Sequence, residues 1–129
     1  MKAFIFPGQG AQTVGMFAPW LTNPTAAALL AELPQDLQII VAQGPEEALR
    51  QTTQAQPALY AVGYAAYAAY LAAGGRPADV VAGHSLGEYT ALAAAGVFSF
   101  TDGLRLVHAR ATAMAAAYPT GGAMAAVLG

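Results

Sequence analysis

The feature that most constrains the fold lies at residues 80–95, where two valines lead into a glycine-flanked turn and then into residues of high helix propensity. Residues 83–87 (Gly-His-Ser-Leu-Gly) fit the pattern G-x-S-x-G, in which small residues on both sides of a serine let the backbone reverse sharply. Glycines also flank serines in ordinary turns, so the strand-turn-helix setting supports the interpretation more than the pattern does. In that setting the first free N–H groups of the helix point at the oxygen of Ser85, which suits a developing oxyanion. Ser85 is therefore the candidate nucleophile.

Composition narrows the classes of protein. The 129 residues suffice for one domain, although many open α/β enzymes need more sequence to complete their sheets. With five Lys and Arg against seven Asp and Glu, the chain offers no basic cluster for nucleic acid. The absence of cysteine excludes disulfides and thiolate zinc sites and favours a cytoplasmic protein. Residues 57–75 are uncharged but rich in alanine and tyrosine, which predicts a buried helix of a soluble protein, not a membrane span.

The N-terminal segment resembles a strand followed by a ligand-binding loop. Residues 2–6 form an apolar run that predicts a buried strand of a parallel sheet. The loop at 7–12 places glycines on both sides of Gln9, so the main chain can approach a ligand or another backbone closely. A plain strand-to-helix turn is an equal alternative for this loop.

The middle of the chain is predicted to be mostly helical. Asn23 or Thr25 caps a helix over 26–33, residues 37–42 form a strand or the start of a helix, and another helix starts at 45–49. A long helix opens at Gln56-Pro57, with proline at its first position, and closes at Gly74-Gly75. Bulky side chains recur at helical spacing and form a stripe on one face of this helix, which consists of Tyr60, Tyr64, Tyr67 and Leu71. We interpret this stripe as a packing surface and not as a binding site.

The last predicted helix carries an arginine in an unexpected place. It begins near Thr101 or Asp102, after Ser99 in a turn or capping role, and extends to about residue 117. At about 100° per residue, Arg110 falls inside an apolar arc that consists of Leu104, Leu106, Val107, Ala111 and Met114. A guanidinium there must reach solvent, pair with another group or bind an anion. No carboxylate on the helix is placed to pair with it, and Arg105 lies on the opposite, solvated side.

Four segments in order resemble the malonyl-CoA:acyl carrier protein transacylase family. They are residues 6–12, 56–59, 83–89 and 105–110. The resemblance covers essentially the whole chain but only the N-terminal portion of the family's usual length. It implies an α/β fold in which residues 1–122 are part of an α/β-hydrolase-like parallel-sheet subdomain. Residues 123–129 would then be the first strand of a ferredoxin-like small subdomain whose remainder is absent from this chain.

The resemblance also implies roles for individual residues. Ser85 would accept a malonyl group from malonyl-CoA and pass it to the phosphopantetheine thiol of acyl carrier protein, with the coenzyme A thioester and phosphopantetheine as substrates and with no bound cofactor or metal. The backbone N–H groups of Gln9 and Leu86 would form the oxyanion hole. Arg110 would bind the malonyl carboxylate through a bidentate pair. The turn itself would be supported by three residues: Gly83, His84 and Gly87.

The general base has no match in this sequence. The family's catalytic histidine comes from sequence well beyond residue 129, and the chain holds only His84 and His108. In the family the residue equivalent to His84 supports the turn, and its side chain should point away from Ser85. His108 lies roughly 200° around its helix from Arg110, so both cannot face one pocket. We therefore expect a second chain or a missing C-terminal segment to supply the base that activates the serine.

Two other functions remain open at this stage. A serine esterase or thioesterase would use the same turn but needs neither a carboxylate-binding arginine nor the Gln9 loop. A non-catalytic half that docks acyl carrier protein is the second alternative, although a scaffold has no use for an exposed nucleophile. A role in fatty-acid synthesis, polyketide synthesis or malonate decarboxylation is equally compatible with the sequence.

Overall fold

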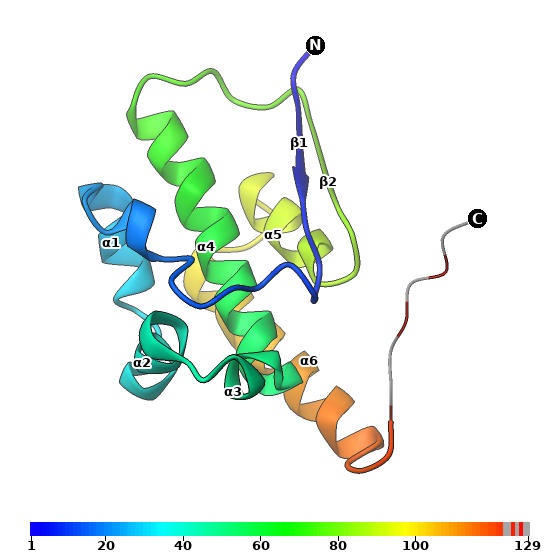
Figure 1. Ribbon diagram of the computed structural model, residues 1–129. Coiled ribbons are helices and arrows are strands. Elements are labelled where there is room, and N and C mark those ends of the chain that lie inside the picture. The colour runs from blue at the N-terminus through cyan, green and yellow to red at the C-terminus, as the bar shows by residue number, and fades with distance from the viewer. Residues whose placement is uncertain (123–124, 126, 128–129) are drawn as a thin grey trace.

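A computed structural model describes residues 1–122, 125 and 127. It shows a largely helical fold around one short parallel sheet (Figure 1). The elements in chain order are β1 (Ala3–Phe6), η1 (Ala18–Trp20), α1 (Pro24–Leu30), α2 (Gln35–Gln43), α3 (Glu46–Arg50), α4 (Thr52–Ala72), β2 (Val80–Gly83), α5 (Gly87–Ala94) and α6 (Phe100–Ala117). The strand expected at the C-terminal end, residues 123–129, falls largely outside the described residues. None of the described helices is both long enough and apolar enough to span a bilayer.

The two strands pair in parallel, in the register Ala3 with Val80 and Phe6 with Gly83. Parallel strands end at the same edge of a sheet, so the loop after β1 and the turn after β2 meet there. The predicted burial of β1 needs correction, because the described residues cover only one face of this sheet. On the other face the Ile5 side chain is 78% exposed and Val80 is 49% exposed. The prediction of a fully buried strand is therefore wrong for the part of the chain described.

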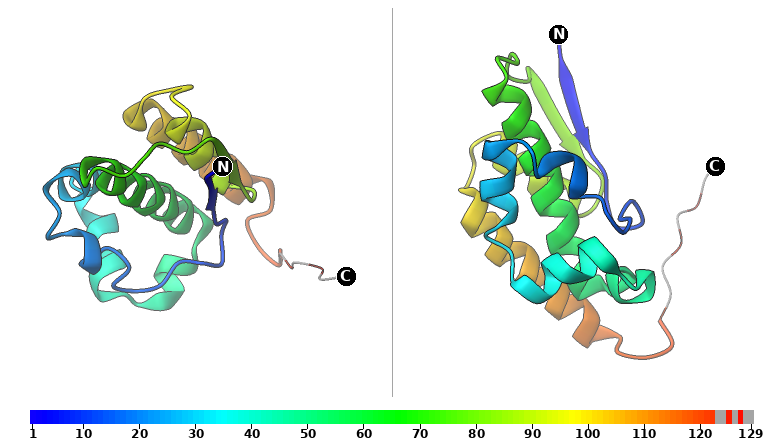
Figure 2. Two further views of the ribbon diagram at one scale, coloured as in Figure 1. Left: turned by 90° about the horizontal axis from the view of Figure 1, so that it is seen from above. Right: turned by 60° about the vertical axis from the view of Figure 1, so that its left-hand side comes forward.

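Helix α4 is the central element of the core. It lies between α1–α3 on one side and α5 and α6 on the other (Figure 2), and it packs against α1, α3, α5 and α6. It begins at Thr52, not at Gln56, so Pro57 lies inside the helix and the predicted start is wrong. Inside a helix, proline removes the bond to the carbonyl four residues earlier, and its ring crowds that carbonyl. The packing of α4 against its neighbours must offset this cost.

The aromatic stripe of α4 packs against two different partners. The Tyr60 ring stacks on Phe100 of α6 at 5.4 Å between centroids, and the Tyr67 ring meets Phe4 of β1 edge-on at 5.1 Å. The Tyr60 hydroxyl donates to the Phe100 carbonyl at 3.0 Å. Burial raises the pKa of Tyr60 well above its ordinary value, because the phenolate form loses its solvation. The interpretation of this stripe as packing is confirmed, and one face of α4 thereby joins α6 to the sheet.

The outer helices start largely where the sequence indicates. The Asn23 side chain accepts from the Ala26 N–H at 3.0 Å and caps α1. Residues 37–42 are helical and belong to α2, where Leu37 and Val41 are buried one turn apart on the core side. Ser99 caps α6 by accepting from the Asp102 N–H at 3.1 Å, which confirms its predicted capping role.

The buried face of α6 differs from the predicted arc. Its buried residues are Phe100, Gly103, Val107 and Ala111, whereas Leu106 is 48% exposed. The reason is Gly103, where an added Cβ would lie 2.0 Å from the Tyr60 hydroxyl. Helix α6 approaches α4 closely at this glycine. A glycine contact of this kind is not revealed by the pattern of hydrophobic side chains.

Candidate active site

Ser85 lies in a strained turn between β2 and α5. Its φ is +53°, the one positive value at a non-glycine residue among the residues described. A left-handed backbone costs an L-residue roughly 1 to 2 kcal/mol, and such strain concentrates at functional sites. Because β2 ends at Gly83 and α5 begins at Gly87, the predicted strand-turn-helix setting is confirmed.

The glycines of the turn are required by close approach of backbone to backbone. A Cβ on Gly83 would lie 1.9 Å from the carbonyl carbon of Gly87. A Cβ on Gly87 would lie 2.1 Å from the Phe6 carbonyl oxygen. The start of α5 therefore rests directly on the ends of both strands, with no room for a side chain between them. This contact sets the height at which the serine stands above the sheet.

His84 takes part in the turn through its main chain. Its N–H donates to the Phe6 carbonyl at 3.1 Å, and its carbonyl accepts from the Gly87 N–H at 2.9 Å. The side chain is exposed and lies beside Gly8, where an added Cβ would be 3.0 Å from the ring Nδ1. His84 thus links the turn to the loop that follows β1.

Arg110 of α6 reaches Ser85, the candidate nucleophile, directly. Its Nη2 donates to Ser85 Oγ at 3.1 Å, and its Nη1 donates to the Gln56 side-chain oxygen of α4 at 2.6 Å. The guanidinium carbon lies 5.6 Å from the centre of the Tyr89 ring on α5. We call Arg110, Gln56 and Tyr89 the Arg110 cluster. It comes from three helices and meets at the serine.

No carboxylate neutralises this guanidinium within the described part of the chain. The ion pairs there join Arg50 to Glu46, Arg76 to Asp79, and Arg105 to Asp102. Arg110 instead contacts two uncharged oxygens and an aromatic face. The partners that the sequence left unidentified are thus Gln56 and Ser85, and the positive charge stays available for an anion.

The loop after β1 is fixed by its glutamine side chain. Gln9 Nε2 donates to the Thr52 hydroxyl, at the start of α4, at 3.1 Å. The backbone N–H of Gln9 and that of Leu86, which precedes α5, have no intramolecular acceptor among the described residues. An oxyanion hole needs such unused donors beside the nucleophile. The assignment of these two groups to the oxyanion hole stays a prediction.

Neither histidine is hydrogen-bonded to the serine. In the described residues the recorded partner of Ser85 Oγ is Arg110, while His84 and His108 are both exposed. A guanidinium has no acceptor atom and donates only, so it cannot take the proton of the hydroxyl. The described residues also include no group of three acidic or histidine side chains placed to hold a metal ion.

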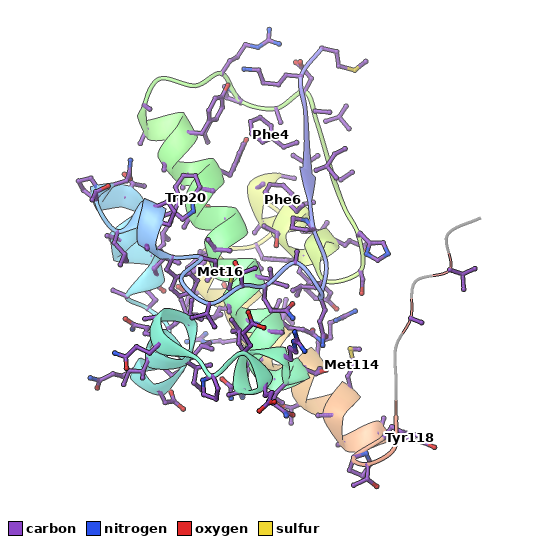
Figure 3. The ribbon with its side chains drawn as sticks, in the orientation of Figure 1. Phe4, Phe6, Met16, Trp20, Met114 and Tyr118 are labelled. Atoms are coloured by element: carbon purple, nitrogen blue, oxygen red, sulfur yellow. The ribbon has the colours of Figure 1, made fainter. Side chains whose placement is uncertain are left out.

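A cavity of about 740 Å³ lies where the start of α4 meets the end of α6, and its described lining includes neither Ser85 nor Arg110. Thr52, which holds Gln9, and Met114, which contacts Gln56, both line it. Figure 3 shows Met114 near the first turns of α4 and Tyr118 beyond it at the end of α6. The cavity therefore adjoins the residues that contact Gln9 and Gln56, and not Ser85 itself.

A known family model matches nearly the full chain. The model is described as the acyl transferase domain, and it matches residues 3–128. The chain belongs to the acyl transferase domain family.

Similar proteins refine this assignment within the acyl transferases. The malonyl CoA-acyl carrier protein transacylase of Escherichia coli K12 is 47% identical over 133 residues, which cover 98% of this chain and 43% of that protein. The crystal structure of the acyl-carrier-protein S-malonyltransferase of Burkholderia pseudomallei 1710b matches with a TM-score of 0.86 and 48% identity, over 92% of this chain and 40% of that one. The malonyl-transacylase PlMCAT, solved with the type II polyketide synthase acyl carrier protein AntF, matches with a TM-score of 0.77 and 43% identity, over 92% and 40%.

The resemblance inferred from the four sequence segments is thus confirmed, and so is the mixed α/β fold. The chain spans about two fifths of the length of the relatives it matches. This part of the family's length contains the serine turn and Arg110.

The sequence assigns no role to two residues of the candidate site. Gln56 lies within the matching segment 56–59, yet it is fully buried and holds Arg110. Thr52 precedes the predicted start of this helix, so the sequence does not point to it. The sequence feature that could have identified Gln56 is its place on the otherwise apolar face of α4, because a buried amide requires hydrogen-bond partners.

Proposed function

We propose that this chain carries the nucleophile and the acyl-group selectivity of a malonyl-CoA:acyl carrier protein transacylase. The observation that carries the proposal is the Arg110 guanidinium, which lies 3.1 Å from Ser85 Oγ with only uncharged partners at hydrogen-bond distance. A cation beside a nucleophile suits an acyl group that ends in a carboxylate. The relatives named as malonyl transacylases support the same substrate.

The first half-reaction loads the serine. Ser85 Oγ attacks the thioester carbonyl carbon of malonyl-CoA, and its proton passes to a general base. The negative charge on the carbonyl oxygen is stabilised by the backbone N–H groups of Gln9 and Leu86. The carbon–sulfur bond then breaks, coenzyme A leaves as the thiol with that proton, and a malonyl ester remains on Ser85.

Arg110 selects the acyl group in this step. On entry of substrate the malonyl carboxylate replaces Ser85 Oγ as the acceptor of Nη2, which frees the hydroxyl for attack. A planar guanidinium can bind the carboxylate through two parallel hydrogen bonds. An acetyl group offers no such acceptor, so the guanidinium would remain without an anion beside it.

The second half-reaction transfers the acyl group to acyl carrier protein. The phosphopantetheine thiol gives its proton to the base and attacks the ester carbonyl. The ester carbon–oxygen bond breaks, malonyl-phosphopantetheine leaves, and Ser85 Oγ recovers the proton. The complex of PlMCAT with a type II polyketide synthase carrier protein is a precedent for such a partner. We expect the reaction in the cytoplasm, in fatty-acid or polyketide synthesis.

The general base is proposed to come from outside the described residues, from a C-terminal segment or a second chain. The support is that Arg110, a pure donor, is the recorded partner of Ser85 Oγ. The chain alone should then acylate slowly, because an unactivated serine is a weak nucleophile at neutral pH.

Intact-mass spectrometry tests the proposal. The chain is incubated at length with malonyl-CoA or with acetyl-CoA, and adducts are quantified for the parent protein, Arg110→Ala and Ser85→Ala. We expect a malonyl adduct that Ser85→Ala abolishes, and a malonyl preference that falls tenfold or more in Arg110→Ala, since charge-assisted bonds are worth roughly 1.5–3 kcal/mol. Equal adducts from both thioesters, or a preference that survives in Arg110→Ala, would instead favour an esterase.

A further inference from the structure

We infer that the first two turns of α4 position both substrate-binding groups: Thr52 holds the Gln9 loop, and Gln56 holds the Arg110 guanidinium. This inference rests on the proposed function and adds to it two positioning residues that contact no substrate. Thr52 and Gln56 are four residues apart, so they lie one above the other on the same face of the helix. One rigid element thereby sets the separation between the predicted oxyanion donor and the carboxylate-binding cation.

The Gln56 contact has the features of a fixed support. The side chain is fully buried, its oxygen accepts from Arg110 Nη1 at 2.6 Å, and its nitrogen lies 3.3 Å from Met114 Sδ. Both ends of the amide are thus engaged, which leaves it one orientation. The bond uses Nη1 and leaves Nη2 directed at Ser85, so Gln56 determines which edge of the guanidinium faces the acyl group.

The Thr52 contact acts on the other group. Thr52 Oγ1 accepts from Gln9 Nε2 at 3.1 Å and is the main tether of this loop to α4 among the described residues. Because the tether holds the Gln9 side chain to α4, it restricts the movement of the loop that carries the Gln9 N–H. Loss of the tether should affect every thioester equally, because all of them develop the same oxyanion.

The two contacts therefore predict different kinetic signatures. Gln56→Leu should lower the malonyl-to-acetyl adduct ratio about tenfold, because it removes a bond to a charged group. Thr52→Val should lower both adduct rates about fivefold and leave their ratio unchanged, while Thr52→Ser keeps the hydroxyl and restores the rates. Gln54→Leu, on the same helix but outside these contacts, should change neither quantity and is the matched control.

A second variant protects the test against misfolding. Gln56→Glu keeps an acceptor of the same size and gives Arg110 a carboxylate, so the guanidinium should be held more firmly but neutralised. Its adduct ratio should fall at least as far as that of Gln56→Leu. A purely structural role of Gln56 predicts no loss of selectivity in this variant.

An activity-independent readout is the guanidinium signal of Arg110 in NMR spectra. The chain has four arginines, so comparison with Arg110→Ala assigns the signal. Rotation of the Arg110 guanidinium should be slow in the parent chain, faster in Gln56→Leu and slowest in Gln56→Glu.

The outcomes separate this inference from the proposed function. If Arg110→Ala abolishes the malonyl preference while Gln56→Leu and Gln56→Glu keep it, the inference is wrong and the function stands. An unchanged Arg110 signal in Gln56→Leu also overturns the inference, whatever the adducts show. If Arg110→Ala itself keeps the preference, the proposed function fails and the inference fails with it.

Discussion

The serine turn and the Arg110 cluster meet at one hydroxyl but are built by different means. In the turn, glycines let backbone touch backbone, and a Cβ at Gly83 or Gly87 would overlap main-chain atoms at about 2 Å. The Arg110 cluster is held by side chains from three helices, through hydrogen bonds to Gln56 and Ser85 and the ring of Tyr89. At its two glycines the first arrangement leaves no room for a side chain, whereas the second depends on side chains that can be changed one at a time.

Under the proposed function, the difference suits two separate tasks. Attack on a thioester is common to all acyl transfers, and it needs a nucleophile at one fixed height above the sheet. Choice of the acyl group varies, and it depends on where one guanidinium points. A rigid backbone turn and an adjustable side-chain cluster allow selectivity to change without disturbance of the nucleophile.

The largest effect is expected in the turn. Gly87→Ala would bring a Cβ to 2.1 Å from the Phe6 carbonyl oxygen, so the strands and α5 must separate. We expect a loss of about 3 kcal/mol or more in the free energy of unfolding, measured by urea denaturation. Gly96→Ala is the control, since its Cβ meets no atom within 4 Å and only the left-handed φ of +77° is unfavourable. Equal losses in the two variants would show that backbone contact does not determine the turn.

A smaller effect is expected where α4 supports α6. Tyr60→Phe removes the hydroxyl that donates to the Phe100 carbonyl, which should cost about 1.5 kcal/mol at neutral pH. Because burial raises the pKa of Tyr60 in the folded state, its stabilising effect is complete below the unfolded pKa of about 10.

Above that pH the unfolded state loses the proton first, and the parent chain should lose up to about 1.4 kcal/mol of stability per pH unit from this residue. Denaturation curves at pH 7 and pH 11 should therefore show a smaller gap between the parent and Tyr60→Phe at pH 11. A gap that widens with pH would contradict the assigned cause.

In the Arg110 cluster, the effect should appear in selectivity and not in folding. Arg110→Lys keeps the charge but cannot bond Gln56 and a carboxylate with the same planar fork, so the malonyl-to-acetyl adduct ratio should fall about tenfold. The urea midpoint should stay close to that of the parent chain. A large shift of the midpoint would mean that this cluster also supports the fold, as the turn does.

The smallest effect concerns the strain at the nucleophile itself. Ser85→Gly and Ser85→Ala both lack the hydroxyl and should form no adduct. They differ in the left-handed backbone, which glycine adopts freely, so the glycine variant should be more stable by about 1 kcal/mol. Thermal denaturation of the pair measures this difference, and equal stabilities would show that the turn is unstrained.

Local patterns predicted the parts of the molecule that depend on neighbours in the sequence. The turn at residues 83–87, the caps at Asn23 and Ser99, and the strands that precede each loop follow from residues a few positions apart. The start of α4 was predicted wrongly, and the buried face of α6 was predicted only in part, since Val107 and Ala111 are buried but Leu106 is not. Both depend on packing, because Pro57 is accepted inside a helix held by its neighbours, and Gly103 faces Tyr60.

By itself, the sequence determined that a serine stands in a tight strand-turn-helix and that an arginine lies where apolar residues should be, since both follow from local spacing and helical periodicity. Only the tertiary structure decided that these two side chains meet, and that Gln56 and Thr52 hold the arginine and the glutamine loop. The physical reason is that a side-chain hydrogen bond between distant segments depends on how whole helices pack. No local pattern in the chain specifies that packing.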